Sequence, residues 1–159
     1  MIKLISLIIA GALTLTGCSS DGSTNNTEDT QVKTESKQEE PKEMNKVLVD
    51  DEYCTITMTG YYEDTTWSEA GFKVTIVNKS DKNLLIGVEN VSVDGTMEDP
   101  FWATTVAAGK ESNEKIYWYT NSEDSNIKSV DDLKNIEMTF NISDDDNWDR
   151  YGEYKVNIE

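Results

Sequence analysis

Histidine is absent from this sequence of 159 residues, and cysteine and proline occur only twice each. Without histidine the chain lacks the commonest general base, the usual catalytic triads and the imidazole ligands of most zinc sites. Basic residues are also few: 14 lysines and arginines stand against 31 aspartates and glutamates, which gives a net charge of −17. A surface of this sign repels phosphate backbones, so we predict no nucleic-acid partner.

Carboxylates are abundant, but no pattern singles out a catalytic one. Residues 47–159 contain 24 acidic residues. Some pairs of the kind used in glycoside hydrolysis are therefore unavoidable, and no spacing distinguishes one pair from the others. We predict a non-enzymatic protein that needs no cofactor.

An apolar run long enough to span a membrane is missing as well. Residues 4–15 form an apolar run of about a dozen residues, whereas a spanning helix needs about 20. The run follows a basic residue, Lys3. A short apolar run behind a positive charge is typical of a signal peptide. We expect residues 1–17 to be a signal peptide.

The end of this run, Leu15-Thr16-Gly17-Cys18, resembles the lipobox of bacterial lipoproteins. The resemblance implies cleavage between Gly17 and Cys18 and a diacylglycerol group on Cys18. Two acyl chains are enough for stable anchoring, so it places the protein at the cell membrane, on its extracellular face. The alternative is an ordinary secretory signal with an incidental cysteine. Cleavage removes Lys3 and no acid, which leaves a mature net charge of −18.

Cys18 is followed by a polar stretch, residues 19–46, whose only apolar residues are Val32 and Met44. Such a segment buries too little surface to offset the entropy lost on ordering. We predict that residues 18–46 are the lipidated cysteine and a disordered acidic linker. All fourteen aromatic residues lie in residues 47–159, a segment of 113 residues with a net charge of −15. This length suits one domain with a core of its own.

Apolar and polar residues alternate through this domain, as in FKVTIVN (72–78), IEMTFNIS (136–143) and YKVNIE (154–159). A period of two predicts strands with one buried face. Cys54 has an apolar position of the same kind in YCTITM. We expect it to be a small buried residue without a disulfide partner, rather than a reactive thiol.

The alternation changes parity within residues 84–93, which predicts a bulge or a change of sheet near Glu89 and Asn90. Turn signals stand at Asp94-Gly95 and at Gly109, and SVDD, residues 129–132, is typical of a capped helical turn. Short strands with turns at this spacing predict an all-β, immunoglobulin-like β-sandwich of about seven to eight strands.

The whole arrangement resembles small Firmicutes (Gram-positive) lipoproteins with an immunoglobulin-like domain of unknown function after a lipobox signal peptide. The resemblance is carried by the lipobox, the acidic linker, FKVTIVNKSDKNLLIGVENVSVDG and DPFWATTVAAGKE. The matching features are the turns at residues 78–82, 94–95 and 108–110. The resemblance implies a fold and a location, and brings no activity or binding residues.

Two stretches are candidate binding sites, of which the first is acidic: SDDDNWDRYG, residues 143–152. Crowded oxygen ligands suit calcium, and an extracellular site can be as weak as about 1 mM. The calcium ligands would be Asp144, Asp146 and Asp149. The alternative is a solvated loop of mutually repelling charges.

The second candidate is KIYWYT, residues 115–120. In a strand, Tyr117 and Tyr119 lie on the face opposite Ile116 and Trp118. Two exposed tyrosines would form a platform for sugar rings or for a partner protein. The alternative is that a loop, DPFWA, covers them. Three tryptophans, Trp67, Trp102 and Trp148, either join this platform or close the ends of the sandwich.

These observations favour a protein-interaction module that binds an unknown protein of the cell envelope. The negative charge would select a basic patch on that partner. The alternative is a carbohydrate- or calcium-dependent module that binds cell-wall glycan.

Overall fold

The computed structural model describes residues 44–100 and 102–159. The predicted signal peptide, Cys18 and most of the predicted linker lie outside the described residues. The described chain forms one short 3-10 helix and nine strands: β1 (Lys46–Asp50), β2 (Cys54–Asp64), β3 (Glu69–Asn78), β4 (Leu84–Val93), β5 (Thr96–Met97), β6 (Ala103–Val106), β7 (Glu111–Tyr119), η1 (Val130–Asp132), β8 (Ile136–Asp144) and β9 (Arg150–Ile158). Over these residues, no helix has the length and apolar character needed to cross a membrane.

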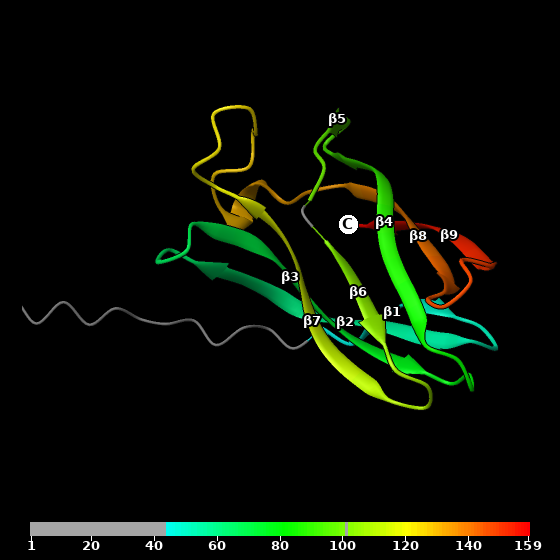
Figure 1. The fold of residues 1–159 in the computed structure, drawn as a ribbon. Helices are drawn as coiled ribbons and strands as arrows, with labels where there is room; N and C mark the ends of the chain where they lie inside the picture. Colours follow the sequence, from blue (N-terminus) through cyan, green and yellow to red (C-terminus); the bar gives the residue numbers. More distant parts are fainter. Residues whose placement is uncertain (1–43, 101) are drawn as a thin grey trace, which may run out of the picture. The chain divides into compact units, whose positions relative to one another are not determined.

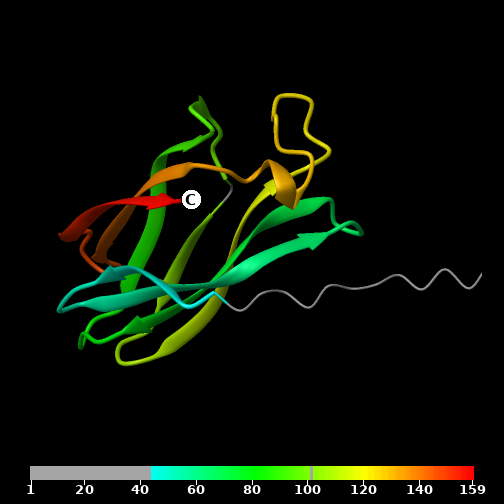
Figure 2. The ribbon, with the colours of Figure 1, turned by 180° about the vertical axis from the view of Figure 1, so that it is seen from behind.

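The strands form two antiparallel sheets that pack face to face (Figure 1, and Figure 2 from behind). The first sheet has the order β1-β2-β3-β7, and the second has the order β5-β4-β8-β9 with β6 also paired to β4. The chain passes between the sheets from β3 to β4, from β6 to β7 and from β7 to β8, which is typical of immunoglobulin-like sandwiches. The predicted all-β sandwich is confirmed, with nine strands in place of seven or eight.

The core lies between the two sheets and is filled by the alternating apolar residues. Phe72 and Ile76 of β3 face Phe140 and Ile142 of β8 across this core, and all four are fully buried. Burying a large apolar side chain stabilises a fold by about 1.5–3 kcal/mol. The strands predicted from the period-two pattern are therefore confirmed, and their shared burial explains why the two sheets stay together.

The register shifts in four of the strand pairings, and the shifts in β4 and β2 change which side chains point inward. The predicted change of parity in β4 is confirmed, because its register against β8 shifts between Glu89 and Ser92, and Asn90 has a φ of 52°. A second bulge, which alternation did not reveal, shifts the register of β2 against β3 between Met58 and Gly60. Gly60 has a φ of 153°, a conformation that residues with a Cβ rarely adopt. This second bulge decides which tyrosine of β2 points outward.

The predicted turns are also found. Asp94 and Gly95 both have positive φ, 49° and 81°, as a two-residue hairpin turn requires. Asp132 is the last residue of η1, and its carboxylate accepts the backbone N–H groups of the two residues before the helix, Lys128 at 2.9 Å and Ser129 at 3.0 Å. The bond from Lys128 is the larger cause that lowers the pKa of Asp132. The capped helical turn is therefore confirmed.

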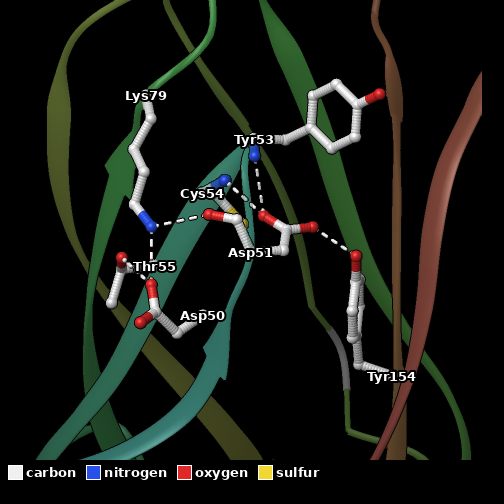
Figure 3. Close-up of polar contacts among 7 residues, drawn as sticks. All are labelled: Asp50, Asp51, Tyr53, Cys54, Thr55, Lys79 and Tyr154. Atoms are coloured by element: carbon white, nitrogen blue, oxygen red, sulfur yellow. Dashed lines mark hydrogen bonds and ion pairs between the residues drawn. The ribbon is translucent and has the colours of Figure 1, made fainter.

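A polar cluster around Asp51 fixes the β1–β2 turn to both sheets (Figure 3). One oxygen of Asp51 accepts the backbone N–H of Tyr53 at 2.8 Å and of Cys54 at 2.7 Å. The other oxygen accepts the hydroxyl of Tyr154, which belongs to β9 in the second sheet. Lys79 donates to the backbone carbonyl of Asp51 at 2.7 Å. The Asp51 carboxylate is thus used to hold the turn in place.

Cys54 is fully buried in the core, as expected, and forms no disulfide with any of the described residues. Burial raises the pKa of its thiol to about 12, so very little of it is thiolate at neutral pH. We expect a Cys18→Ser chain, whose only thiol is Cys54, to remain unlabelled by dithionitrobenzoate at pH 8. The same chain should react completely in 6 M guanidinium, about the concentration that unfolds most domains. Rapid labelling without denaturant would show that Cys54 is accessible, against this description.

Candidate functional site

Tyr117 and Tyr119 both point outward from β7, the edge strand of the first sheet. Tyr119 is 45% exposed, and Tyr117 is partly exposed beside it. Their rings meet edge to face, with centroids 5.4 Å apart and an interplanar angle of 87°. Their hydroxyl oxygens lie 3.4 Å apart. The alternative, that the DPFWA loop covers both tyrosines, is therefore wrong for Tyr119. The two rings form one aromatic surface.

A third tyrosine, Tyr62 of β2, joins them. Gly71 of β3 lies between Tyr62 and Tyr117 in the sheet register, so no side chain separates the two tyrosines. The Tyr62 hydroxyl donates to Glu69 at 3.1 Å, and the Lys115 ammonium lies 4.6 Å from the Tyr62 ring centroid. We call Tyr62, Tyr117 and Tyr119 the tyrosine surface. Sequence reasoning missed Tyr62 because the Gly60 bulge, which turns it outward, leaves no mark in the alternation.

The hydroxyls of Tyr62 and Tyr117 stay protonated at physiological pH. The hydrogen bond with Tyr119, followed by burial, raises the pKa of Tyr117 to about 12. Burial is the larger cause that raises the pKa of Tyr62, and the bond to Glu69 adds to it. Tyr62 and Tyr117 therefore offer neutral rings and hydroxyl groups rather than charges, which suits contacts with uncharged polar groups.

A cavity of about 400 Å³ adjoins the tyrosine surface and shares Tyr117 and Lys115 with it. We call it the β6–β7 cavity, because it lies between two strands that belong to different sheets. Its other lining residues are Trp102, Ala103, Asn113 and Glu114. Binding sites for small molecules typically have volumes of about 300–1,000 Å³. The β6–β7 cavity has a volume in this range and a mixed lining, and it is an open depression rather than an enclosed pocket.

Polar groups along one wall of the β6–β7 cavity are held in place by neighbouring hydroxyls. Glu114 Oε1 accepts Ser112 Oγ at 2.5 Å and Thr104 Oγ1 at 3.2 Å. The Asn113 amide oxygen accepts the Thr75 hydroxyl at 2.8 Å. These bonds fix the two side chains while Glu114 Oε2 accepts from none of the described residues, so it is free to accept from a ligand.

The tryptophans fall into two groups. Trp102 is partly buried and packs edge to face on Phe140, with ring centroids 6.1 Å apart, so it closes the sandwich beside the cavity. Trp67 and Trp148 are 70% and 71% exposed, so the interpretation that they close the ends of the sandwich is wrong for both. Each lies in a tight hairpin turn, where the chain reverses before it can fold back over the core. The turn that carries Trp67 is joined to the end of β7, because the Ser68 carbonyl accepts the backbone N–H of Thr120 at 2.8 Å. Thr120 directly follows Tyr119 of the tyrosine surface.

The acidic loop at residues 144–149 is organised by Asp144, which is buried rather than solvated. Its carboxylate accepts the N–H of Asp146 at 2.8 Å and the hydroxyl of Tyr151 at 3.0 Å. The bond from Asp146 is the largest cause that lowers the pKa of Asp144. Across the described residues, no three acidic or cysteine side chains are grouped closely enough to hold a metal ion. The structure does not bring Asp144, Asp146 and Asp149 together, and calcium binding by them stays a prediction.

The fold and the tyrosine surface together define a β-sandwich with an outward-facing aromatic surface. The chain matches no protein-family model, no curated protein and no solved structure. The resemblance to small Firmicutes lipoproteins therefore stays a prediction.

Proposed function

We propose that this chain is a membrane-tethered, non-enzymatic lipoprotein whose immunoglobulin-like domain binds cell-wall glycan through the tyrosine surface. The lipobox at Cys18 supports a lipid anchor on the extracellular face of the cell membrane. The polar residues 19–46 support a linker that holds the domain away from that membrane.

The observation that carries the proposal is the continuity of the tyrosine surface with the β6–β7 cavity. Tyr117 belongs to both, so flat aromatic rings and fixed hydrogen-bonding groups lie within reach of one ligand. A sugar ring has an apolar face and carries hydroxyl groups around its rim. A tyrosine side chain matches the apolar face with its ring and the hydroxyl groups with its own hydroxyl. From the sequence alone, a protein partner was favoured over cell-wall glycan. The β6–β7 cavity is the reason that we now favour the glycan.

A protein of the envelope is the second candidate, and the charge of the domain favours it. Residues 47–159 carry 24 acidic and nine basic residues, so the domain attracts a basic surface. Association driven by this field weakens as salt screens it, whereas stacking of sugars on tyrosines responds little to salt. The salt dependence of binding therefore separates the two candidates.

The test is co-sedimentation of residues 18–159, made without lipid, with cell walls stripped of protein. We expect the wild-type chain to pellet with the walls, because the tyrosine surface contacts the glycan. The variant with Tyr117→Ala and Tyr119→Ala should remain in the supernatant with an unchanged circular dichroism spectrum. Trp148→Ala is the matched control, since this residue is equally aromatic and exposed but lies in the β8–β9 turn.

Each assay is run with calcium and with a chelator. Loss of pelleting in the chelator alone would bring the acidic loop into the site. Wild-type chain left in the supernatant in both arms would contradict wall binding, and the protein partner would become the leading candidate.

A further inference from the structure

The β6–β7 cavity has the features of a subsite for a single sugar ring. It lies between β7, at the edge of the first sheet, and β6, which pairs with β4 in the second sheet. Trp102 and Tyr117 supply apolar walls, and Asn113, Glu114 and Lys115 supply polar groups. We propose that this cavity binds one uncharged sugar residue of the glycan, an inference that rests on the proposed function and extends it.

The polar wall offers both donors and acceptors to the glycan. Both hydroxyls that bond to Glu114 reach the same oxygen, Oε1, which leaves Oε2 as an acceptor facing no described donor. Lys115 contributes three N–H donors, and its ammonium is already oriented by the Tyr62 ring at 4.6 Å. Because successive side chains of a strand point to opposite faces, Glu114 lies toward β6 whereas the Lys115 ammonium lies over Tyr62 on the outer face. Glu114 therefore accepts from the sugar in the cavity, and Lys115 donates to the part of the glycan that lies on the tyrosine surface.

Trp102 gives an independent reason to expect a ligand here. Its indole N–H is buried and has no acceptor among the described residues. An unpaired buried donor costs about 1–3 kcal/mol, and phenylalanine would make the same edge-to-face contact with Phe140 without that cost. A residue that is less stabilising than an available alternative, as tryptophan is here relative to phenylalanine, is expected more often at functional sites than elsewhere. This nitrogen has no solvent-accessible surface, so a sugar hydroxyl in the cavity accepts from it only after the indole turns toward the cavity, a side-chain change of the kind common on binding.

The charge of the site restricts the class of sugar. The domain has a net charge of −15 over residues 47–159, and Glu114 lines the cavity itself. An anionic polymer such as a teichoic acid is repelled by this field, and a neutral ring is not. The subsite therefore suits neutral hexoses and N-acetylated amino sugars, and excludes phosphorylated or uronic ones.

The test is a ¹⁵N-resolved NMR titration of residues 18–159, carrying Cys18→Ser, with the N-acetylglucosamine trimer. The four tryptophans of the chain give four indole N–H signals, and the signal missing from Trp102→Phe identifies Trp102. We expect this signal to shift saturably while that of Trp148 stays in place. Trp102→Phe should bind about tenfold more weakly, the value of one good hydrogen bond, and melt at the same or a higher temperature.

The outcomes separate the subsite from the wall-binding function. A Trp102 signal that stays in place at about 10 mM trimer, roughly ten times a Kd of 1 mM, would overturn the subsite even if the chain still pellets with walls. Unchanged affinity with a lower melting temperature in Trp102→Phe would also overturn it, because the indole would then serve packing alone. A shifted signal without any pelleting would keep the subsite and contradict wall binding.

Discussion

Replacing Asn78 with alanine is expected to destabilise the domain by about 3–5 kcal/mol, because its side chain joins two loops from inside the protein. Asn78 is 1% exposed. Its amide nitrogen donates to the carbonyls of Lys82 and Val106, both at 2.8 Å, and of Ala107 at 3.2 Å. Its oxygen accepts the backbone N–H of Ser80 at 2.9 Å and the Ser80 hydroxyl at 2.8 Å.

The expected magnitude follows from what Asn78→Ala leaves behind. Several backbone groups lose their partner in a place that water does not reach freely, and each such group costs about 1–3 kcal/mol. Since a domain of this size is stable by only about 5–15 kcal/mol, the loss is a large share of the total. Urea unfolding of residues 18–159 measures it directly.

Two further variants make this test specific. Asn78→Asp keeps the size and the acceptor oxygen but loses the donors and points a charge at three carbonyls, so it should be at least as damaging as alanine. Asn121→Ala, at an exposed position after β7, should change the free energy of unfolding by less than about 0.5 kcal/mol. If Asn78→Ala stayed within 1 kcal/mol of the wild type, roughly the value of a single hydrogen bond, the bracing role would be refuted.

Asn78 also illustrates what sequence can and cannot predict in this fold. The NKSDKN stretch, residues 78–83, predicts a hairpin loop between two strands; it does connect β3 to β4, but these strands belong to different sheets and do not form a hairpin. The bonds from Asn78 to Val106 and Ala107 could not be anticipated, because they join residues that are 28 and 29 positions apart. Turn chemistry is local and can be read from residue types, whereas this contact depends on how the β6–β7 connection comes to lie over the end of β3.

The two bulges differ in the same way. In β4 the apolar residues change parity between Val88 and Val91, so the shift is visible in the sequence. In β2 the shift falls before Tyr61 and Tyr62, and two adjacent tyrosines show no parity at all. Whether Tyr62 points inward or outward can therefore be determined only from the strand register. Tyr62 is one of the three residues of the tyrosine surface, so this part of the surface could not be predicted from the sequence.

The site was predictable where it follows strand alternation and not where it depends on packing between sheets. Tyr117 and Tyr119 were placed on a common face by their spacing, and the structure has them there. The β6–β7 cavity lies between strands of different sheets, so no single segment encodes it. The same limit explains Trp67 and Trp148, since their exposure depends on whether a turn folds back over the core.

Gly71→Ala is expected to damage both the fold and the tyrosine surface, because β3 and β7 approach closely at this position. A Cβ on Gly71 would lie 2.1 Å from the carbonyl oxygen of Ile116 and 2.8 Å from the Cα of Tyr117. Both are backbone atoms, so relief requires the strands to separate rather than a side chain to rotate. Overpacking of this kind costs about 1–3 kcal/mol, and we expect the upper end of that range.

Gly87→Ala is the matched control, because a Cβ there meets only the Cβ of Ala103, at an ordinary 3.9 Å. This variant should be neutral or slightly stabilising, since alanine restricts the unfolded chain more than glycine does. Urea unfolding compares the stabilities of the two variants, and the wall-pelleting assay compares their binding at a temperature where both are folded. Equal stability of the two variants would show that β3 and β7 do not approach as described.

The pelleting result carries a separate consequence for the site. Strand separation at Gly71 moves Tyr117 away from Tyr62, so folded Gly71→Ala molecules should bind walls more weakly although every tyrosine is still present. If they bound as well as Gly87→Ala molecules, the spacing of the rings would be irrelevant and the tyrosines would act one at a time. Weaker binding with intact tyrosines would mean that the glycan contacts a surface whose geometry is set by a glycine, the one residue that lets the rings of two strands lie side by side.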